Sequence, residues 1–329
     1  MTLHTRLTQT LGIEHPIISA PMAFAAGGKL AAAVSATGGL GLIGGGYGDP
    51  EWLEREFAEA RNTRVGCGFI TWSLAKRPRL LELVLAHSPA AVMLSFGSPI
   101  LFAPRIKAAG ATLMCQVQNM DHARVAVDVG ADIIVAQGAE AGGHGLVRAT
   151  FTLVPEIADY LAKAAPATVL VAAGGIADGR GLAAALMLGA DGALIGSRFW
   201  ASAEALVHAA FQNAAIGADG DATTRTTIVD IVRKLDWPEP FTARVMKTRF
   251  VNEWHGREAE LGEPVLVERE MNRYLTAMQS GDANNTGVWV GEVTGLIHDV
   301  RPAADLLHKI VGDAQRLLDT KAHSFVRAS

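Results

Sequence analysis

One histidine in a glycine-rich loop is the residue of this sequence best suited to acid–base chemistry. His144 ends the run Gln137-Gly-Ala-Glu-Ala-Gly142-Gly143-His144, which directly follows an apolar segment that predicts a strand. Glycines on both sides let the backbone approach a ligand closely. An imidazole with an ordinary pKa of about 6.5 suits proton abstraction at neutral pH. We therefore expect His144 to be a general base, with the amides of Gly142 and Gly143 and the side chain of Gln137 available to polar ring edges of a ligand.

Two glycine turns further along the chain could hold a phosphate. The first is Gly174-Gly175 after Val171-Ala-Ala, and the second is Gly196-Ser197 after Leu194-Ile195. Each turn follows an apolar run and precedes a helix-like segment, so backbone amides and a helix N-terminus would face an anion. Ser197 adds a hydroxyl donor. The alternative is that these glycines only make tight turns, but two such turns in succession favour a phosphate site.

Other catalytic patterns are weak or absent. Gly39-Leu-Gly41-Leu-Ile-Gly44 matches a dinucleotide-binding expression, but it runs through a predicted strand and lacks the acidic residue about twenty positions later. No Gly-x-Ser-x-Gly elbow supports a serine hydrolase. His144 has no second histidine or carboxylate at metal-ligand spacing, so we expect no metal.

Short apolar runs alternate with helix-like segments from residue 16 to about residue 205. Most runs are continuously apolar, as expected for strands that are covered on both faces. Eight such alternations predict an α/β fold, a (β/α)₈ TIM barrel, with an open doubly wound sheet as the main alternative. The predicted strands are Pro16–Ser19, Gly41–Gly44, Val65–Ile70, Ala91–Ser95, Thr112–Val117, Asp132–Ala136, Thr168–Ala172 and Gly192–Ile195.

The pattern changes in the last third of the chain. Residues 206–285 are richer in charge, lack the alternation and contain Trp237-Pro-Glu-Pro240, so we expect a mainly helical cap. The apolar, periodic segment that follows should return to the barrel. The predicted domains are therefore a barrel of residues 1–205 plus 286–329 and a cap of residues 206–285.

Composition excludes several classes of protein. The chain has 329 residues, a formal net charge of -4 and no basic run, so we expect no nucleic-acid partner. Its apolar stretches are shorter than a membrane span, and its start does not resemble a signal peptide. Its 2 cysteines, Cys67 and Cys115, lie in apolar runs and are expected to be buried and reduced, which fits a cytoplasmic location.

At these residues the chain resembles the nitronate monooxygenase family, formerly called 2-nitropropane dioxygenases. The resemblance covers nearly the whole length and is carried by four segments: Pro16-Ile-Ile-Ser-Ala-Pro21-Met22, Gln137 to His144, Gly174 to Gly181 and Leu194 to Ser197. It implies FMN held noncovalently at the mouth of the barrel, with His144 as the base that deprotonates nitroalkanes. A nitronate and O₂ would be its small-molecule partners, and a homodimer is left open.

The resemblance also implies particular flavin contacts. Gly68 departs from the pattern, because relatives often carry Gly-Val-Asn where this chain has Gly66-Cys67-Gly68; Thr71 or the backbone would replace the missing amide. Gln116 stands on the fifth strand and is neutral. The implied cofactor-binding residues are Ala20, Pro21, Met22, Gly68, Thr71, Gln116, Gln137, Gly142, Gly143, Gly174, Gly175, Leu194, Ile195, Gly196 and Ser197.

Three other functions stay open at this point. The same motifs resemble NAD(P)H-dependent FMN reductases that act on quinones or on enoyl thioesters, and fold and cofactor do not choose between these electron acceptors. A flavin-free barrel that binds a phosphorylated metabolite and acts as a lyase or isomerase is the second. The third is a noncatalytic binding module that retains the phosphate turns.

Overall fold

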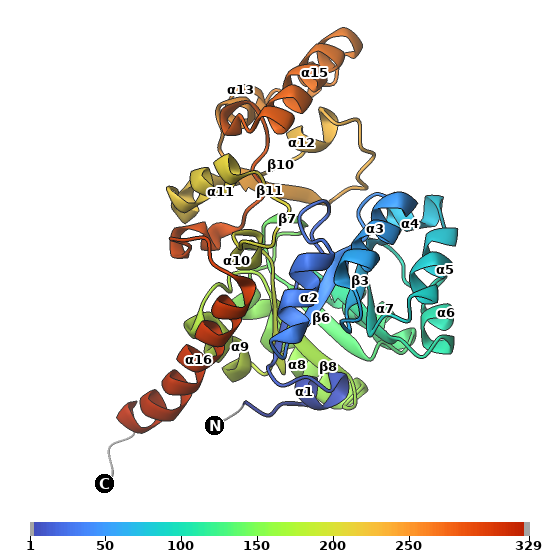
Figure 1. The fold of residues 1–329 in the computed structure, drawn as a ribbon, viewed down its shortest axis with the longest axis vertical. Coiled ribbons are helices and arrows are strands. Elements are labelled where there is room, and N and C mark those ends of the chain that lie inside the picture. The colour runs from blue at the N-terminus through green and yellow to red at the C-terminus, as the bar shows by residue number, and fades with distance from the viewer. Residues whose placement is uncertain (1–2, 326–329) are drawn as a thin grey trace.

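A computed structural model describes residues 3–325 and shows a closed barrel of eight parallel strands (Figure 1). The order is β1-β2-β3-β4-β5-β6-β8-β9, and β9 pairs with β1 to close the ring. The prediction of a (β/α)₈ barrel is therefore confirmed. The strands are β1 Ile17–Ser19, β2 Leu40–Gly44, β3 Gly66–Ile70, β4 Ala91–Ser95, β5 Thr112–Val117, β6 Ile133–Gln137, β8 Val169–Ala173 and β9 Gly192–Ile195.

Helices surround the barrel, and the last long helix runs beside α9 on its outer side (Figure 1). Among the described residues no helix is both long enough and apolar enough to cross a bilayer. The helices of this layer are α1 Arg6–Leu11, α2 Gly28–Ala36, α3 Pro50–Ala60, α4 Thr71–Lys76, α5 Arg79–Ala86, α6 Ala103–Ala108, α7 Met120–Asp128, α8 Thr150–Ala164, α9 Gly179–Met187, α10 Ser197–Trp200 and α16 Ala303–Phe325.

The barrel strands are buried along nearly their whole length, which explains their continuous apolar composition. Cys67 and Cys115 are buried, free thiols within this core, and burial raises the pKa of the Cys115 thiol to about 12. The glycine pattern from Gly39 to Gly44 runs through β2, as its sequence context indicated. These glycines allow helix α2 to lie against the strand, since a Cβ on Gly41 would collide with the backbone of Ala31.

The segment of residues 206–285 covers one end of the barrel and has a hydrophobic cluster of its own, which includes Phe250, Trp254 and Tyr274. Its boundaries as a domain stay a prediction. The segment is mainly helical, as expected, but it also contains two strands that the sequence did not reveal. Its elements are α11 Ala209–Ile216, the 3₁₀ turn η1 Gly220–Ala222, β10 Thr223–Thr226, α12 Ile228–Ile231, β11 Thr242–Met246, α13 Arg249–Trp254, α14 Glu258–Leu261, α15 Pro264–Ser280 and the 3₁₀ turn η2 Ala283–Asn285; η3 Glu292–Leu296 follows it.

Strands β10 and β11 escaped detection because threonines and arginines occupy every position of β10 and two positions of β11. Only alternate residues of β11 are buried, since one face of this small sheet is covered. The third strand of the sheet is β7, Gly143–Gly145, which belongs to the histidine loop of the barrel. It pairs antiparallel with β11, with His144 opposite Ala243. The catalytic candidate is thus held by main-chain pairing with the segment that covers the barrel.

Two arginines of this sheet reinforce the pairing. Arg225 donates to the carbonyl oxygen of Gly145 at 2.6 Å, and Arg244 donates to that of Ala139 at 2.9 Å. Burial, together with the neighbouring charge of Arg244, lowers the pKa of Arg225 to about 10, so this guanidinium still carries its charge at neutral pH. Both ends of the histidine loop are therefore held by charge-assisted hydrogen bonds.

The contact between α2 and β2 generates a test of this packing. We expect Gly41→Ala to lower the free energy of unfolding by about 3 kcal/mol, because backbone atoms of Ala31 cannot move aside as a flexible side chain would. Gly217→Ala is the matched control: its Cβ would meet nothing closer than 3.6 Å. Urea unfolding of both variants measures the effect, and equal stability of the two would contradict the proposed packing.

Candidate active site

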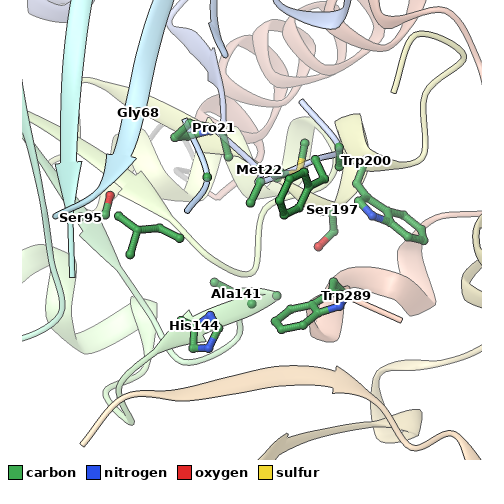
Figure 2. A pocket seen from close by; sticks show the side chains of 18 of the residues that line it. Pro21, Met22, Gly68, Ser95, Ala141, His144, Ser197, Trp200 and Trp289 are labelled. Carbon is green, nitrogen blue, oxygen red and sulfur yellow. The ribbon is translucent and has the colours of Figure 1, made fainter. Parts of the chain in front are cut away.

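A cavity of about 410 Å³ lies at the carboxyl ends of the barrel strands, beneath the segment of residues 206–285. Figure 2 shows Pro21 and Met22 on one side of it, with His144 and Trp289 across from them. The structure brings most of the predicted contact residues together here. Those that line the cavity are Ala20, Pro21, Met22, Gly68, Gln116, Gln137, Gly142, Gly143, His144, Gly174, Gly175, Leu194, Gly196 and Ser197.

Two predicted contact residues lie away from the cavity lining. Thr71 begins α4, is buried, and its hydroxyl has no hydrogen-bond partner among the described residues. Ile195 ends β9, and its side chain packs in the barrel core. Gly68 itself lines the cavity, and a side chain at this position would collide with the ring of Pro21.

His144 is paired with a carboxylate that the sequence did not single out. Its Nε2 lies 2.9 Å from Oδ2 of Asp230, which belongs to α12, and both side chains are almost fully buried. The indole of Trp237 stacks on the imidazole with ring centroids 3.3 Å apart and planes 7° apart. Phe96 touches the imidazole ring from the barrel side. These contacts give the imidazole one orientation.

The surroundings of His144 favour its neutral form. Burial lowers the pKa of His144 below its ordinary value, the hydrogen bond and charge of Asp230 act in the opposite direction, and the charge of Arg233 lowers it further. With Nε2 donating its proton to the carboxylate, Nδ1 keeps the free lone pair. Nδ1 makes no hydrogen bond with the described residues, and it is the nitrogen left to accept a proton from a substrate.

A chain of side-chain amides supports the histidine loop from below. Gln116 and Gln118 both donate to Oε1 of Gln137, at 2.8 and 3.0 Å. Gln137 in turn donates to the carbonyl oxygen of His144 at 3.1 Å. The amide of Gln137 is thus used largely to position the loop, in addition to lining the cavity.

The glycine turns fit a phosphate group, although they offer fewer hydrogen-bond donors than the sequence suggested. Gly174 and Gly175 have φ angles of 93° and 75°, which only glycine adopts freely, and their amides donate to no other group of the described chain. Gly196 lies next to Ala20 and Met22 of the cavity lining, since an added Cβ would meet these side chains at 3.6 and 3.8 Å, which is ordinary van der Waals contact. Ser197 accepts a hydrogen bond from the amide of Gly291 at 2.9 Å and keeps its own proton for donation.

The helix behind the first turn does not contribute as expected. Asp178 caps α9, and its carboxylate accepts from the amides of Arg180 and Gly181 at 2.9 and 3.2 Å. These amides are therefore unavailable to a ligand, and the amides of Gly174 and Gly175 are the donors of the first turn that have no partner among the described residues. Among the described residues no group of three or more side chains is placed to hold a metal ion.

Several residues of the site were not found from the sequence. Asp230, Arg233 and Trp237 all come from the segment of residues 206–285, which showed no motif. Tyr47, from the loop after β2, also lines the cavity and accepts a hydrogen bond from Nε1 of Trp237 at 3.0 Å. The only signal was the aromatic and proline-rich run at Trp237, which marked a change of composition and not a role.

A parallel barrel with a buried imidazole–carboxylate pair facing a glycine-lined cavity at its carboxyl end defines an enzyme of the (β/α)₈ class. Within that class, the model of the family described as nitronate monooxygenase matches residues 4–66 and 70–313. The chain belongs to this family and is an oxidoreductase. Enzymes of the family are in general flavin-dependent.

Several relatives resemble the chain over most of its length. A nitronate monooxygenase of Neurospora crassa is 32% identical, covering 91% of this chain and 89% of its own. The enzyme named nitronate monooxygenase npaC of Metarhizium robertsii is 33% identical, with coverage of 92% and 91%. A bacterial relative, the hydroxy-methyl-oxo-octahydroindene-carboxyl-CoA dehydrogenase of Mycobacterium tuberculosis, is 28% identical over 97% of this chain and 98% of its own.

Two solved structures are also similar. FabK from Thermotoga maritima superposes with a TM-score of 0.86 and 31% identity, covering 99% of this chain and 100% of its own. A nitroalkane oxidase from Streptomyces ansochromogenes has a TM-score of 0.80 and 24% identity, covering 96% of this chain and 100% of its own. At that identity the second likeness concerns the fold alone.

The pairing of His144 with Asp230 predicts how the imidazole titrates. In Asp230→Asn the negative charge that raises the pKa of His144 is gone while burial and Arg233 remain, so His144 should take up its proton at lower pH than in the wild type. NMR titration of selectively labelled histidine measures this, with the exposed Asp236→Asn as the matched control. An unchanged or higher titration midpoint in Asp230→Asn would contradict the assigned pairing.

Proposed function

We propose that the protein is an FMN-dependent nitronate monooxygenase. It would oxidise alkyl nitronates, and nitroalkanes that it first deprotonates, to carbonyl compounds and nitrite with O₂. The observation that carries the proposal is that His144, oriented by Asp230 and with a pKa lowered by burial, lines the same cavity as the glycine turns. Membership of the nitronate monooxygenase family supports it.

FMN fits the donor groups that line the cavity. The amides of Gly174 and Gly175, with the hydroxyl of Ser197, would hold its phosphate, and Ala20 to Met22 would lie along its ring. When bound, FMN supplies the two-electron redox chemistry and the reaction with O₂. The task of the protein is to place the substrate carbon against it and to keep bulk water out.

His144 performs the proton transfer in this proposal. A nitroalkane carries an acidic proton on the carbon next to its nitro group, and Nδ1 of His144 would accept that proton while the C–H electron pair moves towards the nitro oxygens. Asp230 would stabilise the imidazolium that forms, as a carboxylate beside a catalytic histidine does. A nitronate has already lost this proton, so its oxidation needs no base.

An NAD(P)H-dependent reductase is the second candidate, and two likenesses favour it. FabK from Thermotoga maritima is as similar in sequence as the fungal nitronate monooxygenases, and the dehydrogenase of Mycobacterium tuberculosis acts on a CoA thioester, as its name states. The cavity is lined mainly by apolar groups, among them Phe211 and Val293, and an acyl chain would be accommodated there.

The role of His144 can be tested by substitution. We expect His144→Asn to reduce kcat/KM for a neutral nitroalkane by about a hundredfold or more, because the base is lost, and to reduce it far less for the preformed nitronate. Nitrite release under steady-state conditions measures both. The surface variant His255→Asn is the control. Equal losses on the two substrates would remove the base assignment and leave the flavin assignment untouched.

Anaerobic mixing with NADH distinguishes the two candidate functions. A nitronate monooxygenase should leave the visible absorbance of the oxidised flavin unchanged over many turnover times, because NADH is not its substrate. Rapid bleaching of the flavin, followed by reoxidation with a quinone or an enoyl thioester, would establish the reductase instead.

A further inference from the structure

The side chain of Arg233 enters the same cavity as His144 and lies over two aromatic rings. Its guanidinium carbon lies 4.6 Å from the ring centroid of Trp289 and 5.8 Å from that of Tyr47. The side chain is only 15% exposed. The N–H groups of a guanidinium lie in its plane, so its hydrogen bonds are made at its edges while its faces are free to contact rings.

The protein uses only part of the hydrogen-bonding capacity of this guanidinium. Nε donates to the carbonyl oxygen of Val229 at 2.6 Å, and Nη2 donates to Oδ1 of Asp230 at 3.1 Å. The guanidinium also hydrogen-bonds to the hydroxyl oxygen of Tyr47, and its remaining N–H groups make no further hydrogen bond with the described residues. The fork of an arginine matches a planar group with two oxygens, such as a carboxylate or a nitro group.

Tyr47 supplies a second donor at the same place. Its hydroxyl oxygen accepts from Trp237 at 3.0 Å, so its proton is directed elsewhere. Burial raises the pKa of Tyr47, although the charge of Arg233 opposes this, and the phenol therefore remains a donor at neutral pH. A positive charge and a neutral donor thus meet at one side of the cavity.

Asp230 holds Arg233, and with it the donors of Arg233 and Tyr47, in a fixed position relative to His144. Oδ2 receives the hydrogen bond from His144, and Oδ1 receives the one from Arg233. With a neutral imidazole, the three side chains carry no net charge. When the imidazole accepts the substrate proton, the cluster gains one positive charge at the moment when negative charge appears on the substrate oxygens.

We propose that Arg233, assisted by Tyr47, binds the two oxygens of the substrate nitro group and thereby selects planar two-oxygen anions over single carbonyl oxygens. The inference rests on the proposed nitronate chemistry and assigns the specificity of the same site. In the deprotonation step the C–H bond breaks, the proton passes to Nδ1 of His144, a C=N bond forms, and the negative charge rests on the oxygens held by Arg233.

Binding of nitrate tests the inference without turnover. Nitrate is a planar oxyanion with no oxidisable carbon, and isothermal titration of the flavin-loaded protein measures its affinity. We expect Arg233→Met to weaken nitrate binding at least tenfold. Arg233→Lys keeps the charge beside Asp230 but loses the fork, and should weaken binding by a smaller factor. Arg124→Met, an exposed arginine on α7 that pairs with Asp121, is the matched control and should bind as the wild type does.

Steady-state kinetics give the second measurement. In Arg233→Lys the KM for a nitronate should rise at least fivefold, with a smaller change in kcat, since the interaction acts mainly on the bound anion. Wild-type affinity for nitrate in both Arg233 variants, or an unchanged KM in Arg233→Lys, would overturn the inference. A third outcome separates the two ideas. If nitrate binding is lost in the Arg233 variants but the wild-type protein releases no nitrite from any nitronate, the anion site is supported and the proposed function is rejected.

Discussion

The antiparallel pairing of β7 with β11 is the constraint on which the site depends. It converts a barrel loop into the third strand of a sheet that belongs to the covering segment, so that His144 is held between the two parts of the molecule. Main-chain hydrogen bonds and the donors of Arg225 and Arg244 give the loop one conformation. The pairing places the His144 side chain where it meets Asp230 and Trp237 of the covering segment.

Burial then determines the chemistry of that histidine. A buried imidazole resists protonation, and a buried carboxylate must be paired to be tolerated. The Asp230 carboxylate is paired on both oxygens, with His144 on one and Arg233 on the other, while burial keeps the pKa of His144 below its ordinary value. The three groups compensate one another, so the cavity contains a base and a cation without an isolated charge.

The barrel contributes a different kind of constraint, which is close packing. Glycines permit strands and helices to approach where a side chain would collide, as at Gly41. At Gly174 and Gly175 they leave main-chain amides without a partner among the described residues, and there we propose that a phosphate binds. Glycines thus serve close packing at some positions of the fold and a proposed phosphate site at others. Their position relative to the carboxyl ends of the strands separates the two.

The sequence by itself determined the barrel, because each buried strand carries its own continuous apolar run, and it located His144 and the glycine turns, because they follow such runs directly. Only the tertiary structure decided what His144 is paired with. Asp230 stands 86 positions away from it, in a segment without a recognisable motif. Local composition reports burial and turns, whereas the contacts of a base depend on which distant segments the fold brings together.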